Sequence, residues 1–136
     1  MKPTLTPGER QILGQIPESD LASLAAELSI AVPDQIDGAS LAVECIVSLA
    51  QLARTEGLPL SKFDRDDLEY MTVAERTALA ELCGYPDDVS GMIKAGTKVY
   101  KNWRRTRPRS PIALMLPVFL PPLARFAAAQ SSADQG

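Results

Sequence analysis

Seven basic side chains lie between positions 94 and 109, and no acidic residue lies among them. They are Lys94, Lys98, Lys101, Arg104, Arg105, Arg107 and Arg109. Ammonium and guanidinium groups bind carboxylates and phosphates through charge-assisted hydrogen bonds. The segment is therefore the strongest candidate in the chain for a contact with an anionic partner.

The residue types that carry out catalysis form no recognisable pattern. The chain has no histidine, which is the commonest general acid and base. Serine-hydrolase, phosphate-binding and dinucleotide-binding motifs do not occur. Cys45 and Cys83 lie within apolar helical patterns and there is no CxxC pair, so we expect two reduced, buried thiols. The sequence thus predicts a protein that is not an enzyme, with no cofactor, no metal site and no catalytic residue.

Four carboxylates at 64–69 could in principle bind a cation. They are Asp64, Asp66, Asp67 and Glu69. Their spacing lacks the glycine turn and the terminal glutamate of a calcium loop. We expect Asp64 to cap a short helix, with Phe63 and Leu68 forming a hydrophobic staple across its first turn.

Charge is distributed unevenly along the chain. The net charge is −3, but residues 1–93 carry 6 basic and 16 acidic side chains, a net of −10. Proteins that bind nucleic acid usually have a basic domain as a whole. An acidic body with one basic segment therefore favours an acidic protein partner, while nucleic acid remains an alternative.

The elements around this segment are predicted to be helices. Thr6 and Thr72 each begin a capping-box pattern, and residues 40–56 are apolar on nearly every side, as in the central helix of a bundle. Few runs alternate with a period of two, so no sheet is expected. The predicted fold is all-α, a compact bundle of about six or seven short helices over residues 1–105.

The basic residues fall on one side of a predicted amphipathic helix that begins near Val89. Lys94, Lys98, Lys101 and Arg105 share a narrow arc. The opposite side is formed by Val89, Met92, Ile93, Gly96, Val99, Tyr100 and Trp103. We expect Trp103 to face the bundle, Gly96 to allow close packing, and the basic arc to face water.

Residues 106–130 are predicted to form a linker and an apolar segment whose helix is broken by Pro117, Pro121 and Pro122. The segment either folds back over its own bundle or presents an apolar patch to a partner or to a second copy. Its candidate contact residues are Leu114, Met115, Val118, Phe119, Leu120, Leu123 and Phe126. The uncharged run is too short and too rich in proline for a transmembrane span, and residues 131–136 are expected to be disordered.

Together these patterns predict a small adaptor or regulatory protein that binds another protein, or itself, through the basic helix and the apolar segment. No secretory signal is recognisable, so we expect a cytoplasmic protein. Two alternatives remain open. One is a nucleic-acid-binding regulator that uses residues 94–109, and the other is peripheral contact with a membrane.

Overall fold

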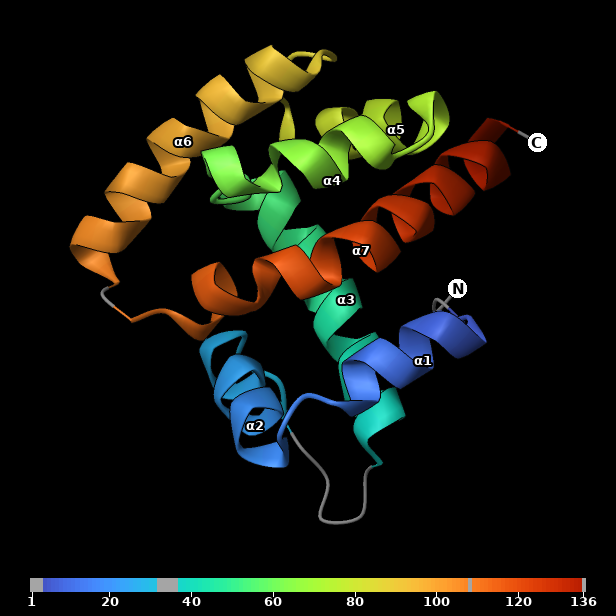
Figure 1. The fold of residues 1–136 in the computed structure, drawn as a ribbon, viewed down its shortest axis with the longest axis vertical. Helices are drawn as coiled ribbons and strands as arrows, with labels where there is room; N and C mark the ends of the chain where they lie inside the picture. Colours follow the sequence, from blue (N-terminus) through green and yellow to red (C-terminus); the bar gives the residue numbers. More distant parts are fainter. Residues whose placement is uncertain (1–3, 32–36, 108, 136) are drawn as a thin grey trace.

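The structure is a computed structural model that describes residues 4–31, 37–107 and 109–135, with the side chains of 131–135 left out. The described residues form seven α-helices and one short 3₁₀ helix, with no strand among them (Figure 1). These are α1 (Pro7–Gly14), α2 (Glu18–Glu27), α3 (Gly38–Glu56), η1 (Lys62–Asp64), α4 (Arg65–Tyr70), α5 (Val73–Cys83), α6 (Val89–Thr106) and α7 (Pro111–Gln135). The all-α prediction is confirmed.

Helix ends follow the local signals in the sequence. Thr6 and Thr72 form the two predicted capping boxes, with Glu9 and Glu75 respectively. In each box the threonine hydroxyl accepts from a backbone N–H and the glutamate accepts from the threonine's own N–H. The α3 helix ends at Gly57, where φ is +83°, a conformation that side chains other than glycine rarely adopt.

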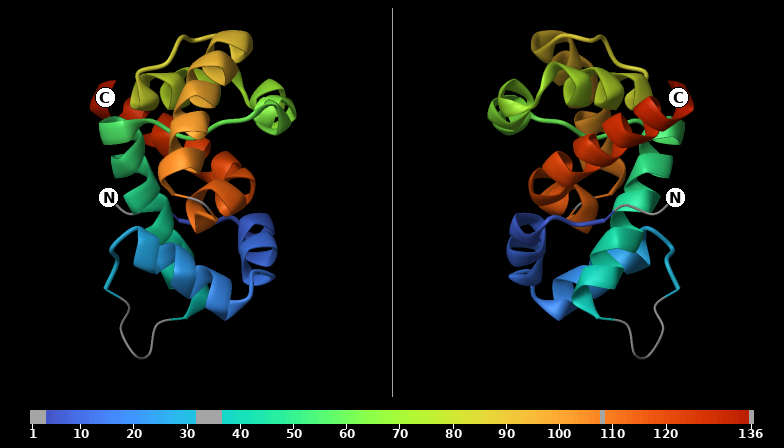
Figure 2. Two further views of the ribbon diagram at one scale, coloured as in Figure 1. Left: turned by 90° about the vertical axis from the view of Figure 1, so that its left-hand side faces the viewer. Right: turned by 90° about the vertical axis from the view of Figure 1, so that its right-hand side faces the viewer.

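The core forms where α3 and α7 cross. Figures 1 and 2 show α7 running across the molecule, and its most extensive packing is against α5, with further contacts to α1, α2, α3 and α4. Ile46 and Leu49 of α3 are almost completely buried, as are Phe119, Leu120 and Leu123 of α7. The predicted central helix at 40–56 therefore shares the centre of the bundle with the C-terminal helix.

The proline-broken segment is in fact one continuous helix, so that part of the prediction is wrong. Pro117 and Pro121 are exposed on the outer side of α7, whereas the apolar side chains of its inner side are buried. Each proline removes one backbone hydrogen bond. Burial of a full apolar stripe outweighs that loss, as tertiary packing commonly does for helices. The backbone helix also continues through Gln135, where a disordered tail was expected.

Asp64 occupies the predicted N-cap position of the short helix α4, but its side chain makes no capping hydrogen bond there. The 3₁₀ helix η1 precedes α4 and has Ser61 as its N-cap, and the Asp64 carboxylate accepts a 2.8 Å hydrogen bond from the Ser61 N–H. Phe63 is 79% exposed, so it forms no staple with the buried Leu68. Burial raises the pKa of Asp64 despite its hydrogen bonds with Ser61.

Candidate binding surface

The α6 helix forms one outer edge of the molecule (Figure 1), and its buried residues, Met92, Gly96 and Trp103, all come from its apolar side. Met92 is fully buried and Trp103 is only 4% exposed. A Cβ placed on Gly96 would lie 2.3 Å from the Leu60 Cβ, so glycine is required for this approach. The structure confirms that Trp103 faces inward and that Gly96 permits close packing.

The opposite side of α6 is exposed and strongly positive. We call Lys94, Lys98, Lys101 and Arg105 the basic face. Within the described chain, the three lysines have no hydrogen-bonding or ion-pairing partner, and Arg105 bonds only to Asn102 of its own helix, at 2.8 Å. These charges are therefore available to an external anion.

The other three arginines lie around the junction of α6 and α7. Arg107 is engaged within the fold, because it pairs with Glu56 at 3.2 Å and its guanidinium carbon lies 4.0 Å above the Trp103 ring centroid. Arg104 and Arg109 are exposed and have no partner in the described part of the chain. Arg109 has a φ of +64°, which is uncommon for a residue other than glycine.

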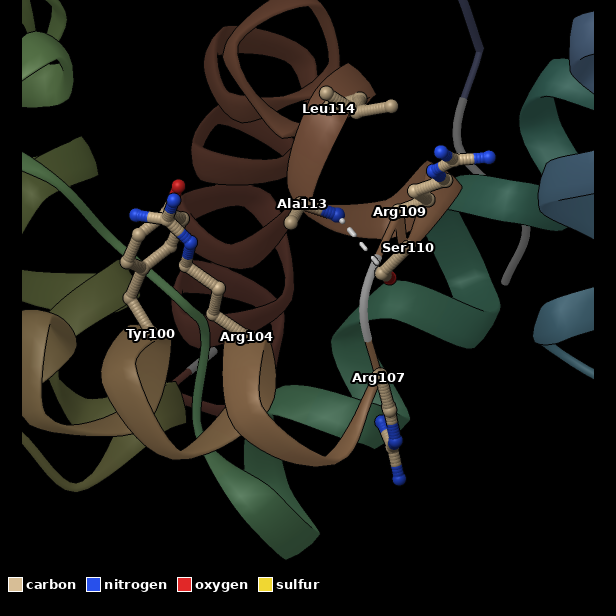
Figure 3. A pocket seen from close by; sticks show the side chains of 7 residues that line it. All are labelled: Tyr100, Arg104, Arg107, Arg109, Ser110, Ala113 and Leu114. Atoms are coloured by element: carbon tan, nitrogen blue, oxygen red, sulfur yellow. Dashed lines mark hydrogen bonds between the residues drawn. The ribbon is translucent and has the colours of Figure 1, made fainter.

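A half-open cavity of about 450 Å³ lies at this junction (Figure 3). The residues lining it are Tyr100, Arg104, Arg107, Arg109, Ser110, Ala113 and Leu114. Arg104 points toward Tyr100, Arg109 lies on the other side near Leu114, and Arg107 points away from both. The three guanidinium groups therefore do not converge on a single point.

One wall of the cavity is held by a buried polar network. The Trp103 indole N–H donates to the Ser110 hydroxyl at 2.9 Å, and this hydroxyl donates to the Glu27 carboxylate. A second Glu27 oxygen lies 3.4 Å from the Ile112 backbone nitrogen in the first turn of α7. A single hydroxyl thus connects α2, α6 and α7. No local pattern in the sequence signals the bond between Ser110 and Glu27, which lie far apart along the chain.

The apolar residues predicted for partner contact mostly belong to the core. Phe119, Leu120 and Leu123 are fully buried, Phe126 is 6% exposed and Met115 is half-buried. Only Leu114, which is 73% exposed, and Val118, at 36%, are presented at the surface. Of the two alternatives, the segment adopts the first and folds back over its own bundle. The reason is that a continuous helix places residues three and four apart on one side.

Neither cysteine belongs to the basic face or to the lining of the cavity. Cys45 is buried and Cys83 half-buried, and both are free. Burial raises the pKa of Cys45 to about 11 and that of Cys83 to about 12. Among the described residues, no three or more cysteine, aspartate or glutamate side chains gather closely enough to hold a metal ion.

Among the described residues, one helix is long enough and apolar enough to cross a membrane, by length and composition alone. The stretch from Pro111 to Gln130 has a mean hydropathy of 1.7, and half of its most apolar window is buried within the bundle.

Comparison of the chain with protein-family models, with curated proteins and with solved structures finds no match.

Proposed function

We propose that this chain is a cytoplasmic, non-enzymatic adaptor that binds an acidic segment of another protein through its basic face, Arg104 and Arg109. The observation that carries the proposal is the set of six exposed cations along α6 and at its junction with α7, with no intramolecular carboxylate paired to any of them in the described chain. Such a surface steers acidic partners and sets their orientation.

The rest of the molecule favours a protein over nucleic acid or lipid. The net charge of −10 carried by residues 1–93 repels a polyanion that extends beyond the basic edge. A helix that binds a membrane surface needs a free apolar side. The apolar side of α6 is instead occupied by the bundle, as the burial of Met92 and Trp103 demonstrates.

A matched pair of double variants tests the proposal. Lys94→Glu with Lys98→Glu reverses half of the basic face, while Arg10→Glu with Lys62→Glu reverses two exposed cations elsewhere. Both pairs lower the net charge by four, so a general charge effect is common to the two. Circular dichroism should show that both variants keep the helical content of the wild type.

The readout is quantitative capture from native lysate, at about 0.05 M and about 0.5 M salt, since exposed charge pairs are screened at the higher value. We expect acidic proteins that are retained at low salt by the wild type and by the Arg10/Lys62 variant, and lost by the Lys94/Lys98 variant. Equal capture by the two variants would refute the proposal. Retention of nucleic acid in place of protein would support the alternative function.

A further inference from the structure

The cavity at the α6–α7 junction combines an apolar floor with charged sides. The Tyr100 ring, Ala113 and the exposed Leu114 provide apolar contact surface, and the exposed arginines flank it. Cavities that recognise one side chain of a partner have this composition, because the apolar part supplies affinity and the polar edge supplies orientation.

The directions of the arginines separate two kinds of ligand. A small anion such as phosphate requires donors that converge on one point. Here Arg104 and Arg109 extend on opposite sides of the cavity, and Arg107 points away toward its contacts with Glu56 and Trp103 (Figure 3). The arrangement instead suits an extended chain that carries negative charges before and after a central residue.

We propose that the cavity binds one apolar side chain of the acidic partner segment, while Arg104 and Arg109 pair with carboxylates on either side of that anchor. This inference rests on the proposed function and adds a recognition rule to it, namely an apolar residue within an acidic run. The cavity is preorganised, because Ser110 is 6% exposed and fixed by Trp103 and Glu27. This wall therefore needs little ordering at binding, and the remaining entropic cost falls on the exposed side chains of Arg104 and Arg109.

Two synthetic peptides test this rule. Each carries a fluorescein label and six glutamates, three on either side of a central residue, which is phenylalanine in one peptide and glycine in the other. Partial burial of the ring predicts about tenfold tighter binding of the phenylalanine peptide. Fluorescence anisotropy at low salt measures both affinities with the full chain.

A pair of surface variants locates the effect. Leu114→Ser removes apolar contact at the cavity, whereas Ile12→Ser removes a comparably exposed side chain in α1, where Ile12 is 57% exposed. We expect Leu114→Ser to abolish most of the preference for phenylalanine and Ile12→Ser to leave it unchanged. Because both side chains are exposed, both variants should fold. Trp103, the single tryptophan and a neighbour of the cavity wall, gives an independent emission readout.

The outcomes separate this inference from the proposed function. Equal binding of the two peptides, with a loss of binding in the Lys94/Lys98 variant, would overturn the cavity rule and leave the basic face intact. A preference for phenylalanine that survives Leu114→Ser would place the anchor elsewhere and also overturn the rule. If neither peptide binds at low salt, both proposals fail.

Discussion

Replacement of Ser110 by alanine is the most informative single change, because one hydroxyl joins three helices. The substitution removes the acceptor of the Trp103 indole N–H and the donor to Glu27. It also removes the side-chain cap of α7, because the Ser110 hydroxyl lies 3.5 Å from the Ala113 nitrogen, whereas the bond from the Leu114 N–H to the Ser110 backbone carbonyl is kept. The indole donor is then left buried without a partner.

The magnitude follows from these contacts. An unsatisfied buried donor costs roughly 1–3 kcal/mol. Loss of a helix cap costs about 0.5–2 kcal/mol, and the long 3.5 Å contact places this cap at the low end. We expect the free energy of unfolding to fall by about 2–3 kcal/mol. For a chain of 136 residues this lowers Tm by roughly 6–12 °C.

Urea and thermal unfolding, followed by circular dichroism and by Trp103 emission, measure the change. Ser23→Ala is the control, because Ser23 is an exposed serine in α2 that bonds only to the carbonyl of Ser19 within its own helix. It should shift stability by less than about 0.5 kcal/mol. If Ser110→Ala behaves like this control, the three-helix network does not contribute as argued.

A double-mutant cycle with Glu27→Gln identifies the network directly. If Glu27 and Ser110 act through the same bond, the double variant should lose less stability than the sum of the two single losses. The expected coupling is about 1 kcal/mol or more. Simple additivity would assign the Ser110 effect to the cap and to Trp103 alone.

Three further predictions concern other parts of the fold. Pro117→Ala should raise stability by about 1–2 kcal/mol, because an exposed helical position regains its backbone donor, and urea unfolding measures the gain. Gly96→Ala should lower stability by about 1–2 kcal/mol in the same assay, since the added Cβ lies within 2.3 Å of Leu60. Burial by itself would raise the pKa of Glu9. The hydrogen bonds that its carboxylate accepts from Arg125 and from the Thr6 backbone N–H outweigh burial, so the pKa of Glu9 lies below its ordinary value. Folding lowers the pKa of Glu9, so the stability that the Glu9–Arg125 ion pair contributes is fully present above the pKa that Glu9 has in the unfolded chain. This stability is lost as the pH falls through the lower pKa that Glu9 has in the folded chain. Glu9→Gln should thus lower the free energy of unfolding by about 1 kcal/mol at neutral pH and by progressively less below about pH 4. Measurement of Tm as a function of pH tests this expectation.

Each of these has a result that contradicts it. A destabilising Pro117→Ala would mean that the proline stabilises α7 through rigidity. An unchanged Gly96→Ala protein would show that α6 does not pack closely on Leu60. A Glu9→Gln effect that is constant across pH would show that the 2.6 Å contact between Glu9 and Arg125 is not an ion pair in solution.

Features that depend on residues close in sequence were predictable. The capping boxes at Thr6 and Thr72, the end of α3 at Gly57 and the two sides of α6 all follow from local hydrogen bonding and helical periodicity. Even the close approach at Gly96 is indicated by a glycine within an apolar stripe. Local rules succeed here because each of these elements has one dominant local preference.

The continuous α7 was not predictable by the same rules. Three prolines within the helix argue for a break, and local propensity has no means of weighing that loss against burial of Leu116, Phe119 and Leu123. Apolar residues recur at spacings of three and four in the sequence, but three prolines oppose a helix when local propensity alone is considered. The bond between Ser110 and Glu27 spans 83 positions, and no local pattern encodes it.

The position of α7 changes how the surface must be interpreted. When the apolar segment is treated as an appendage, its leucines and phenylalanines provide the hydrophobic part of an interface. In the folded chain these side chains are buried against the bundle, and only Leu114 and Val118 remain substantially exposed. Under the proposed function, the affinity for an acidic partner comes from the cations of α6 and from the small apolar cavity beside Leu114. Electrostatic contacts between exposed groups are individually weak and are screened by salt. A partner that uses this surface should consequently bind with modest affinity, exchange rapidly, and depend on the anchor side chain for its specificity.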